Sequence, residues 1–326
     1  MKIAFFNAKP YDINFFTEAN ASFGFDIHYF DVHLSLKTCS LAKGHQAVCV
    51  FVNDTITKEI IDCLLELNVG LIALRSSGYN HVDLQAAQGK IPVVRVPRYS
   101  PFSVAEHAVA LMLCLNRKLH RAYVRTRENN FSIKGLLGFD MHGKTAGVIG
   151  CGQIGAAVVQ MLKGFGMHVL GYDIDKSQVE QAGCAYVDLP TLYKTSDIIT
   201  LHCPLSSKTQ HMIDSKAFSL IKEGALLINT ARGGLIDTEA LIEALKSQKL
   251  SAAGLDVYEG ESPYFYEDLS SSFIPDDTLA RLQTFPNVLI TSHQGFFTKE
   301  ALQHIAETTL KNIHAYSERK PLMNQI

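Results

Sequence analysis

Residues Thr145 to Asp173 read TAGVIGCGQIGAAVVQMLKGFGMHVLGYD. An apolar run leads into Gly150, Gly152 and Gly155 with the spacing G-x-G-x-x-G, a helical pattern follows, and a second apolar run ends at the acid. This order predicts a strand, a tight turn, a helix and a second strand. A glycine fingerprint in that context is typical of a dinucleotide-binding unit, whereas the same glycines without strand and helix would indicate only an ordinary turn.

Each glycine has an expected mechanical role in such a unit. Gly150 would make the turn, Gly152 would let the backbone approach a pyrophosphate, and Gly155 would let the helix pack closely on the strand. The helix N-terminus would then offer amides and the positive end of its dipole to the phosphates. Asp173 lies about 20 residues beyond the glycines, where an acid binds the ribose hydroxyls. Its charge would repel the additional phosphate of NADP, so the sequence favours NAD.

The composition is that of an ordinary folded protein. With 326 residues the chain is long enough for about two domains, each with its own core. A net charge of −2 argues against nucleic acid or an anionic membrane surface as a partner. No apolar run approaches the about 20 residues of a membrane span, and the N-terminal run is too short for a signal peptide. We therefore expect a cytoplasmic protein.

Cysteine usage is consistent with this expectation. The seven cysteines are scattered, contain no C-x-x-C pair and mostly lie in apolar surroundings. We expect them to be reduced, buried thiols, and we expect no metal site.

The first third of the chain alternates short apolar strands with helical patterns. This alternation predicts a parallel sheet with helices on both faces. The first turn reads Asn7-Ala8-Lys9-Pro10 and lacks a glycine fingerprint, so this domain is not expected to bind a dinucleotide. The polar loop Arg75 to Asn80 follows a strand, at the sheet edge where ligands bind in open α/β folds, although it also suits a plain turn. Strands are predicted at Lys2–Asn7, Asp26–Phe30, Ala47–Val52, Gly70–Leu74 and Val93–Val96.

Two long helices are predicted around the dinucleotide unit. One amphipathic helix is expected from Phe102 to about Glu128, with Ser100 and Pro101 as its start signal, and it is a candidate subunit interface. We interpret Glu106 and His107 on this helix as surface or interface residues. The second helix, Thr298 to Tyr316, is expected to return the chain to the first domain.

Four predicted strands after the fingerprint end in residues that are able to line a ligand site. They deliver Cys203, Arg232, Asp256 and His293, in chain order, to the sheet edge that also carries the glycine turn. The acidic segment Glu259 to Asp277 is expected to be a long loop near the same edge. This convergence predicts a cofactor site.

Hydride transfer at such a site needs a proton carrier and a clamp for the substrate. His293 suits proton exchange near neutral pH, and Glu261 is placed to accept a hydrogen bond from its other ring nitrogen. Arg232 offers a planar fork that matches a carboxylate. Taken singly, each residue has an ordinary structural alternative, such as a hydrogen-bonded histidine or a surface cation.

Together these motifs resemble one family. The fingerprint, Asp173, the run Thr230-Ala231-Arg232-Gly-Gly, the stretch Asp256 to Glu261 and the pair His293-Gln294 resemble the D-specific 2-hydroxyacid dehydrogenases, most closely the fermentative D-lactate dehydrogenases. The segments Pro97-Arg98-Tyr99-Ser100-Pro101, Val104-Ala105-Glu106-His107 and Glu300-Ala301-Leu302 match as well, so the resemblance spans nearly the whole chain.

The resemblance implies a fold and an activity. A flavodoxin-like substrate domain, residues 1–98 plus 296–326, would receive a Rossmann NAD-binding domain, residues 99–295, as an insertion. The enzyme would reversibly reduce pyruvate to D-lactate with NADH, and His293 would exchange the proton.

It also implies roles for individual residues. Arg232 would hold the carboxylate and carbonyl of the substrate, with Glu261 hydrogen-bonded to His293. The amides of Ser77 and Gly78 and the hydroxyl of Tyr99 would bind the carboxylate from the first domain. The residues expected along the cofactor are Gly150, Gly152, Gln153, Ile154, Gly155, Asp173, Cys203, Pro204, Thr230, Ala231 and Asp256.

Two alternatives remain open. One is a dehydrogenase for bulkier 2-keto acids, and the other is an NAD(H)-sensing protein like the corepressors that share this fold. Because sensors can keep the catalytic residues, Arg232, Glu261 and His293 do not decide between enzyme and sensor. We expect an enzyme, since the sequence shows no extended partner-binding segment, and a homo-oligomer, either dimer or tetramer.

Overall fold

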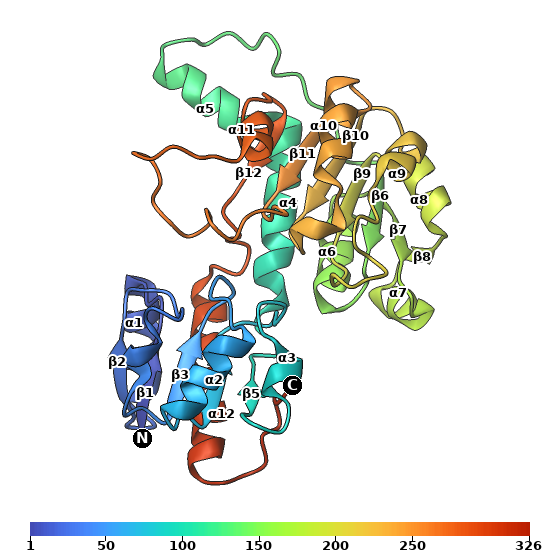
Figure 1. Cartoon of the computed structure of the whole chain (residues 1–326). Helices are drawn as coiled ribbons and strands as arrows, with labels where there is room; N and C mark the ends of the chain where they lie inside the picture. The colour runs from blue at the N-terminus through green and yellow to red at the C-terminus, as the bar shows by residue number, and fades with distance from the viewer. The chain divides into compact units, whose positions relative to one another are not determined.

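The computed structural model describes residues 1–326 and divides into two compact units. One comprises Met1–Ser100 with Phe297–Ile326, and the other comprises Pro101–Phe296. Each contains one parallel sheet with helices on its faces (Figure 1), so the predicted fold class of two doubly wound α/β domains is confirmed. None of the helices combines the length and the apolar character needed to cross a membrane.

The first unit carries a five-stranded sheet in the order β2-β1-β3-β4-β5, which is the flavodoxin-like order. All its strand pairs are parallel. Its elements are β1 (Lys2–Phe5), α1 (Pro10–Asn20), β2 (Asp26–Tyr29), η1 (Cys39–Ala42), β3 (Ala47–Val50), α2 (Lys58–Glu66), β4 (Leu71–Leu74), α3 (Leu84–Ala87), β5 (Val93–Val94) and α12 (Lys299–Ser317).

Both faces of this sheet are covered, which explains why β3 and β4 are apolar throughout. On one face, Ile3 and Phe5 pack with residues of α1 and with Leu310 of α12. On the other face, Val48 and Ile72 pack with η1 and α2. The terminal helix therefore completes the first unit, as expected for the segment Thr298 to Tyr316, and Thr298 caps it by accepting a hydrogen bond from the amide of Ala301.

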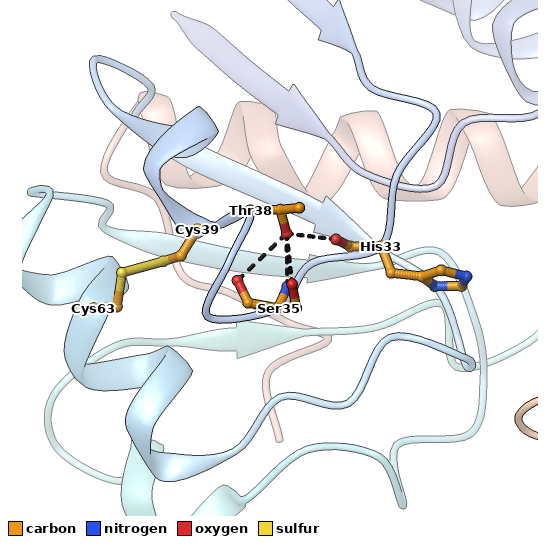
Figure 2. Close-up of a disulfide and its surroundings, with 5 residues drawn as sticks. All are labelled: His33, Ser35, Thr38, Cys39 and Cys63. Atoms are coloured by element: carbon orange, nitrogen blue, oxygen red, sulfur yellow. Dashed lines mark hydrogen bonds between the residues drawn. A yellow bond between two sulfur atoms is a disulfide. The ribbon is translucent and has the colours of Figure 1, made fainter.

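The expectation that all cysteines are reduced is wrong for one pair. Cys39 of η1 and Cys63 of α2 form a disulfide (Figure 2), with 6.7 Å between their Cα atoms. The two elements pack together in the same apolar cluster. Sequence spacing gives no sign of this pairing, because the two cysteines meet only through packing of η1 on α2.

The second unit carries a seven-stranded sheet in the order β12-β11-β10-β9-β6-β7-β8. The chain reverses its winding direction between β6 and β9, which is where ligands bind in open α/β sheets. Its elements are α4 (Pro101–Arg117), α5 (Leu119–Arg127), β6 (Thr145–Ile149), α6 (Gln153–Gly164), β7 (His168–Tyr172), α7 (Lys176–Ala182), β8 (Ala185–Tyr186), α8 (Leu189–Thr195), β9 (Ile198–Leu201), α9 (Ser215–Leu220), β10 (Ala225–Asn229), η2 (Gly233–Leu235), α10 (Thr238–Lys246), β11 (Leu250–Leu255), α11 (Asp277–Gln283) and β12 (Val288–Ile290).

The single helix predicted from Phe102 to about Glu128 is wrong in one respect. Lys118 has φ +52° and separates α4 from α5. Just before the break, the Asn116 side chain donates a hydrogen bond to the Phe139 carbonyl and accepts one from the Phe139 amide. These long-range bonds hold the end of α4 in place, and α5 with the segment after it extends from the rest of this unit (Figure 1).

Candidate functional site

The glycine turn between β6 and α6 depends on two close approaches. Gly150 has φ +91°, and a Cβ atom there would lie 2.5 Å from the backbone nitrogen of Cys203. A Cβ atom on Gly155 would lie 1.9 Å from the carbonyl oxygen of Gly150. Side chains at either position would push the turn away from β9 or the helix away from β6. Glycine is therefore required at both positions for this packing.

The N-terminus of α6 is open. Gly152 is its N-cap, has no side-chain cap bond and is exposed, and no atom lies within 4 Å of a Cβ built there. The amides of Gln153 and Ile154 donate no hydrogen bond within the chain. Unpaired amides at the start of a twelve-residue helix fit the phosphates of a dinucleotide.

Asp173 stands beside this turn. One of its carboxylate oxygens accepts a hydrogen bond from the Cys151 amide at 2.8 Å, and the other accepts one from the Asp175 amide at 3.0 Å. The residue is half-buried at the end of β7. Its negative charge is therefore held next to the open turn, where it would repel a phosphate on the adenosine ribose.

The neighbouring strands β9 and β10 bring further predicted cofactor residues to the same edge. Burial raises the pKa of the Cys203 thiol to about 11, so it is neutral, and Pro204 follows it. Thr230 is 6% exposed, and its hydroxyl oxygen is buried without a hydrogen-bond partner. A buried hydroxyl without a partner costs free energy, which a polar ligand group would recover, so Thr230 and the adjacent Ala231 fit a cofactor edge.

The turn that carries Arg232 is tied down by Asn229, a fully buried residue at the end of β10. Its side chain donates a hydrogen bond to the Arg232 carbonyl at 2.8 Å and accepts one from the Ala231 amide at 3.0 Å. A Cβ atom on the next residue, Gly233, would lie 2.3 Å from the backbone nitrogen of Glu259. The Arg232 turn therefore packs directly against the loop that leads to Glu261.

His293 and Glu261 form the predicted pair. The Nδ1 atom of His293 lies 2.7 Å from Oε1 of Glu261, and Oε2 of Glu261 accepts a hydrogen bond from the Tyr258 amide at 2.8 Å. Because a carboxylate only accepts, Nδ1 carries the hydrogen and Nε2 remains for another partner. The two side chains are 17% and 23% exposed, so they are partly shielded yet accessible.

Asp256, one of the residues predicted to contact the cofactor, is buried. Its side chain is 1% exposed and lies behind the residues that precede and follow His293. It accepts hydrogen bonds from the Thr291 hydroxyl at 2.6 Å and from the amides of Gln294 and Gly295 at 2.9 and 2.8 Å. Its carboxylate thus orients the loop that carries His293.

His107 supports this carboxylate, so the interpretation of His107 as a surface or interface residue is wrong. Its Nε2 atom lies 3.1 Å from Oδ1 of Asp256 and 3.0 Å from the Thr291 hydroxyl, and its side chain is 17% exposed. Burial alone would raise the pKa of Asp256, but hydrogen bonds from His107 and Thr291 hold it below its ordinary value. Because α4 meets this loop only in the folded chain, helical periodicity could not reveal the contact.

The predicted substrate residues of the first unit lie after β4 and β5. The carbonyls of Ser77 and Gly78 accept hydrogen bonds from Arg95 and Ser76, whereas the Ser77 and Gly78 amides donate none within the chain. Tyr99 is half-buried. The two unpaired amides would suit a carboxylate.

Arg75, at the start of the same loop, turns inward and is 2% exposed. Its guanidinium donates to the Asn7 carbonyl at 2.8 Å, lies 3.5 Å from the Asp12 carboxylate and stacks 4.5 Å from the Phe5 ring centroid. The sequence placed it in a polar loop and gave no signal for this interior role.

Comparisons with known proteins identify relatives in sequence and in structure. Residues 109–295 match the family model described as D-isomer specific 2-hydroxyacid dehydrogenase, NAD binding domain. The chain is 48% identical to the D-lactate dehydrogenase of Escherichia coli, with 100% of each chain covered. The apo-structure of D-lactate dehydrogenase from Escherichia coli aligns with a TM-score of 0.91 at 46% identity, covering 100% of both chains. A structure reported for the pyruvate reductase of Chlamydomonas reinhardtii aligns with a TM-score of 0.93 at 42% identity, covering 99% of this chain and 98% of that one.

Proposed function

The chain belongs to the D-isomer specific 2-hydroxyacid dehydrogenases, and on this premise we propose that it is an NAD-dependent D-lactate dehydrogenase that reversibly reduces pyruvate. One observation carries the proposal. The His293–Glu261 pair, with a 2.7 Å hydrogen bond, belongs to the same sheet edge as the open, uncapped glycine turn. An oriented proton carrier and a phosphate-binding turn are the two parts that a nicotinamide-dependent dehydrogenase needs.

In this proposal NADH supplies the hydride, and residues of the chain manage the proton and the charge. His293 would donate its Nε2 proton to the oxygen that was the carbonyl of pyruvate. Glu261 stabilises the charged ring before transfer and keeps it oriented afterwards. Arg232 would neutralise the substrate carboxylate and hold it in plane. In the reverse direction, neutral His293 would accept the proton of the hydroxyl.

The assignment of units and residues is part of the same proposal. Residues 99–295 would bind the cofactor, and residues 1–98 with 296–326 would contribute substrate contacts, among them the Ser77 and Gly78 amides and the Tyr99 hydroxyl. The cofactor would contact Gly150, Gly152, Gln153, Ile154, Gly155, Asp173, Cys203, Pro204, Thr230, Ala231 and Asp256. Asp256 also holds the loop that carries His293.

The first experiment follows NADH oxidation with pyruvate, phenylpyruvate and 2-ketoisocaproate over a concentration series. We expect the highest kcat/KM with pyruvate and D-lactate as the product. A higher value with a bulky keto acid would retain the family and overturn the choice of substrate. Binding of NADH without turnover of any of these acids would instead support a sensor.

A matched pair of variants tests the proton carrier. The chain has a second His–Glu pair, in which Nε2 of His211 lies 2.6 Å from Glu259 and both side chains are more than a third exposed. We expect His293→Gln to abolish turnover with NADH binding retained, and His211→Gln to leave turnover near that of the parent protein. Near-normal turnover by His293→Gln would remove His293 from the proposed role.

We also propose that the protein is a cytoplasmic homo-oligomer. The exposed apolar side chains of α5 and the segment after it are too numerous for a region in contact with water alone, and a second copy would cover them. They are Leu119, Tyr123, Val124, Phe131, Ile133 and Leu137. Light scattering gives the molar mass of the parent protein and of the double variant Phe131→Asp, Ile133→Asp. We expect an oligomeric parent and a variant of lower mass. A monomeric parent protein would contradict the proposal.

A further inference from the structure

Two cysteine thiols converge behind the glycine turn. Cys151 lies between Gly150 and Gly152, and Cys184 follows α7 at the entrance to β8. Gly171 of β7, the strand between β6 and β8, separates them. A Cβ atom on Gly171 would lie 2.6 Å from the sulfur of Cys184 and 3.0 Å from that of Cys151. The two sulfur atoms therefore share the space that is open because β7 has no side chain at this position.

The two thiols differ in reactivity. Interaction with the neighbouring Cys184 sulfur, together with burial, raises the pKa of the Cys151 thiol. The same interaction lowers the pKa of Cys184, and the positive charge of Lys163 lowers it further. Lys163 is held nearby because its ammonium donates a hydrogen bond to the Gly183 carbonyl. Cys184 is half-buried while Cys151 is only 2% exposed, so Cys184 is the thiol that an oxidant reaches.

We propose that Cys151 and Cys184 are a redox-active dithiol, and that their oxidation by a low-molecular-weight disulfide weakens binding of the cofactor. The Cys184 thiolate attacks one sulfur of the small disulfide, forms a mixed disulfide and releases one thiolate. Cys151 then gives up its proton and attacks the Cys184 sulfur, which forms the Cys151–Cys184 bond and releases the second thiol. Two protein thiols are oxidised, and one small disulfide is reduced to two thiols.

The new bond would act on the phosphate-binding turn through Cys151. A disulfide brings its sulfur atoms to about 2.05 Å, much closer than two thiols in contact, so one or both backbones must move. Cys151 is bound through its amide to Asp173 at 2.8 Å, and the neighbouring Gly150 amide donates to the Tyr172 carbonyl at 2.8 Å. Displacement of Cys151 therefore disturbs both Asp173 and the glycine turn that precedes the open amides of α6.

The other free cysteines do not offer this arrangement. The Cys203 sulfur contacts the thioether of Met212 at 3.6 Å, and the Cys114 sulfur lies 3.6 Å from a ring nitrogen of His120. Cys114 is half-buried like Cys184, which makes it a matched control.

The experiment treats the reduced full-length protein with glutathione disulfide and measures two quantities. Peptide mapping without reduction identifies the linked cysteines, and fluorescence titration gives the Kd for NADH before oxidation, after it and after reduction with dithiothreitol. We expect a Cys151–Cys184 cross-link, a Kd for NADH about tenfold higher and full reversal by dithiothreitol. Cys184→Ser should make NADH binding insensitive to glutathione disulfide, whereas Cys114→Ser should respond as the parent protein does.

Absence of the cross-link after prolonged oxidation would overturn the inference, as would a cross-linked protein with an unchanged Kd. The NADH readout rests on the proposed function, but the two failures are distinguishable. Reduced protein that does not bind NADH would contradict the proposed cofactor site. The cross-linked peptide is detected by peptide mapping whether or not the protein binds NADH.

Discussion

The two sheets begin alike, but only one of them leaves the first turn open. Each has a buried strand, a turn and a helix, β1 to α1 in the first unit and β6 to α6 in the second. In the first unit, the Lys9 amide donates to the Asp12 carboxylate at 3.1 Å, and Pro10 occupies the first helical turn. In the second unit, the helix begins at Gly152 with no side-chain cap. An α/β turn is available to a phosphate only when side chains of the chain do not already occupy its amides.

The acids after the second strands differ in the same way. Asp31 follows β2, is 80% exposed and lies 3.5 Å from the ammonium of Lys9 in the first turn. Asp173 follows β7 and accepts a hydrogen bond from the Cys151 amide of the glycine turn. Asp31 is therefore paired with the Lys9 cation, whereas Asp173 places its negative charge beside the open glycine turn.

Beneath the two turns, the packing differs as well. The first is supported by the buried guanidinium of Arg75, which contacts the Asn7 carbonyl and the Phe5 and Phe51 rings. The second rests on contact of backbone with backbone, because Gly150 approaches Cys203 and Gly155 approaches Gly150. One turn is filled with side chains and the other is kept clear of them, which predicts opposite sensitivities to mutation.

The largest expected effect is loss of the buried cation in the first unit. Arg75→Met would leave the Asp12 carboxylate buried without its partner, and we expect a loss of about 3 to 5 kcal/mol in the free energy of unfolding. Urea denaturation followed by circular dichroism measures this. Addition of Asp12→Asn to the variant should recover part of the loss, because no unpaired charge remains.

The pH dependence of this variant has a definite sign. Burial already raises the pKa of Asp12, and removal of Arg75 would raise it further. A carboxyl whose pKa is raised by folding stabilises the protein below its unfolded pKa, and this contribution is lost as the pH rises through the folded value. The variant should therefore lose less stability at about pH 4 than at about pH 8. An equal loss at both values would contradict the buried-charge explanation.

The next effect concerns packing under the glycine turn. Gly155→Ala would place a Cβ atom 1.9 Å from the Gly150 carbonyl oxygen, which belongs to the backbone and has little freedom to move. We expect a loss of about 1 to 3 kcal/mol in stability. Thermal unfolding measures it, and Gly164→Ala in the last turn of α6, where a Cβ atom meets nothing within 4 Å, is the control.

Local patterns predicted much of this architecture. The five strands predicted in the first third of the chain all form, and their bounds lie within two residues of the predicted ones, because short apolar runs mark them in the sequence. The short, polar α7 was not predicted, since it has little apolar periodicity. The break at Lys118 also escaped prediction, because the bonds between Asn116 and Phe139 that accompany it join residues far apart in the sequence.

The candidate site shows the same division. The open glycine turn and the His293–Glu261 hydrogen bond follow from motifs that the sequence displays. The contact between His107 and Asp256, which supports the His293 loop, does not follow from any motif, because His107 reaches Asp256 only through the packing of α4 on the sheet. The inward turn of Arg75 was hidden for a related reason, as its partners Phe5 and Asp12 lie on other elements.

The third prediction separates ligand binding from folding at the open turn. Gly152→Ala adds a methyl group that meets no atom within 4 Å, and the residue has an ordinary φ of −63°. We expect unchanged thermal stability but binding of NADH about tenfold weaker, or about 1.4 kcal/mol, because the methyl group would occupy the space of the pyrophosphate. Calorimetric titration measures the affinity. Unchanged affinity would mean that the phosphates lie elsewhere, whereas lost stability would contradict the open space seen at this position.

The smallest expected effects come from neutralising the two acids. Asp31→Asn removes one exposed ion pair, so stability should change by less than about 1 kcal/mol and the Kd for NADH should stay the same. Asp173→Asn retains a side-chain oxygen for the Cys151 amide but removes the charge beside the open turn. It should therefore reduce the preference for NADH over NADPH by about tenfold, since repulsion of the additional phosphate is lost. Paired kcat/KM values with both cofactors measure this preference. If Asp31→Asn altered it as much as Asp173→Asn, the effect would be one of net charge, and the contrast between the two turns would not explain cofactor choice.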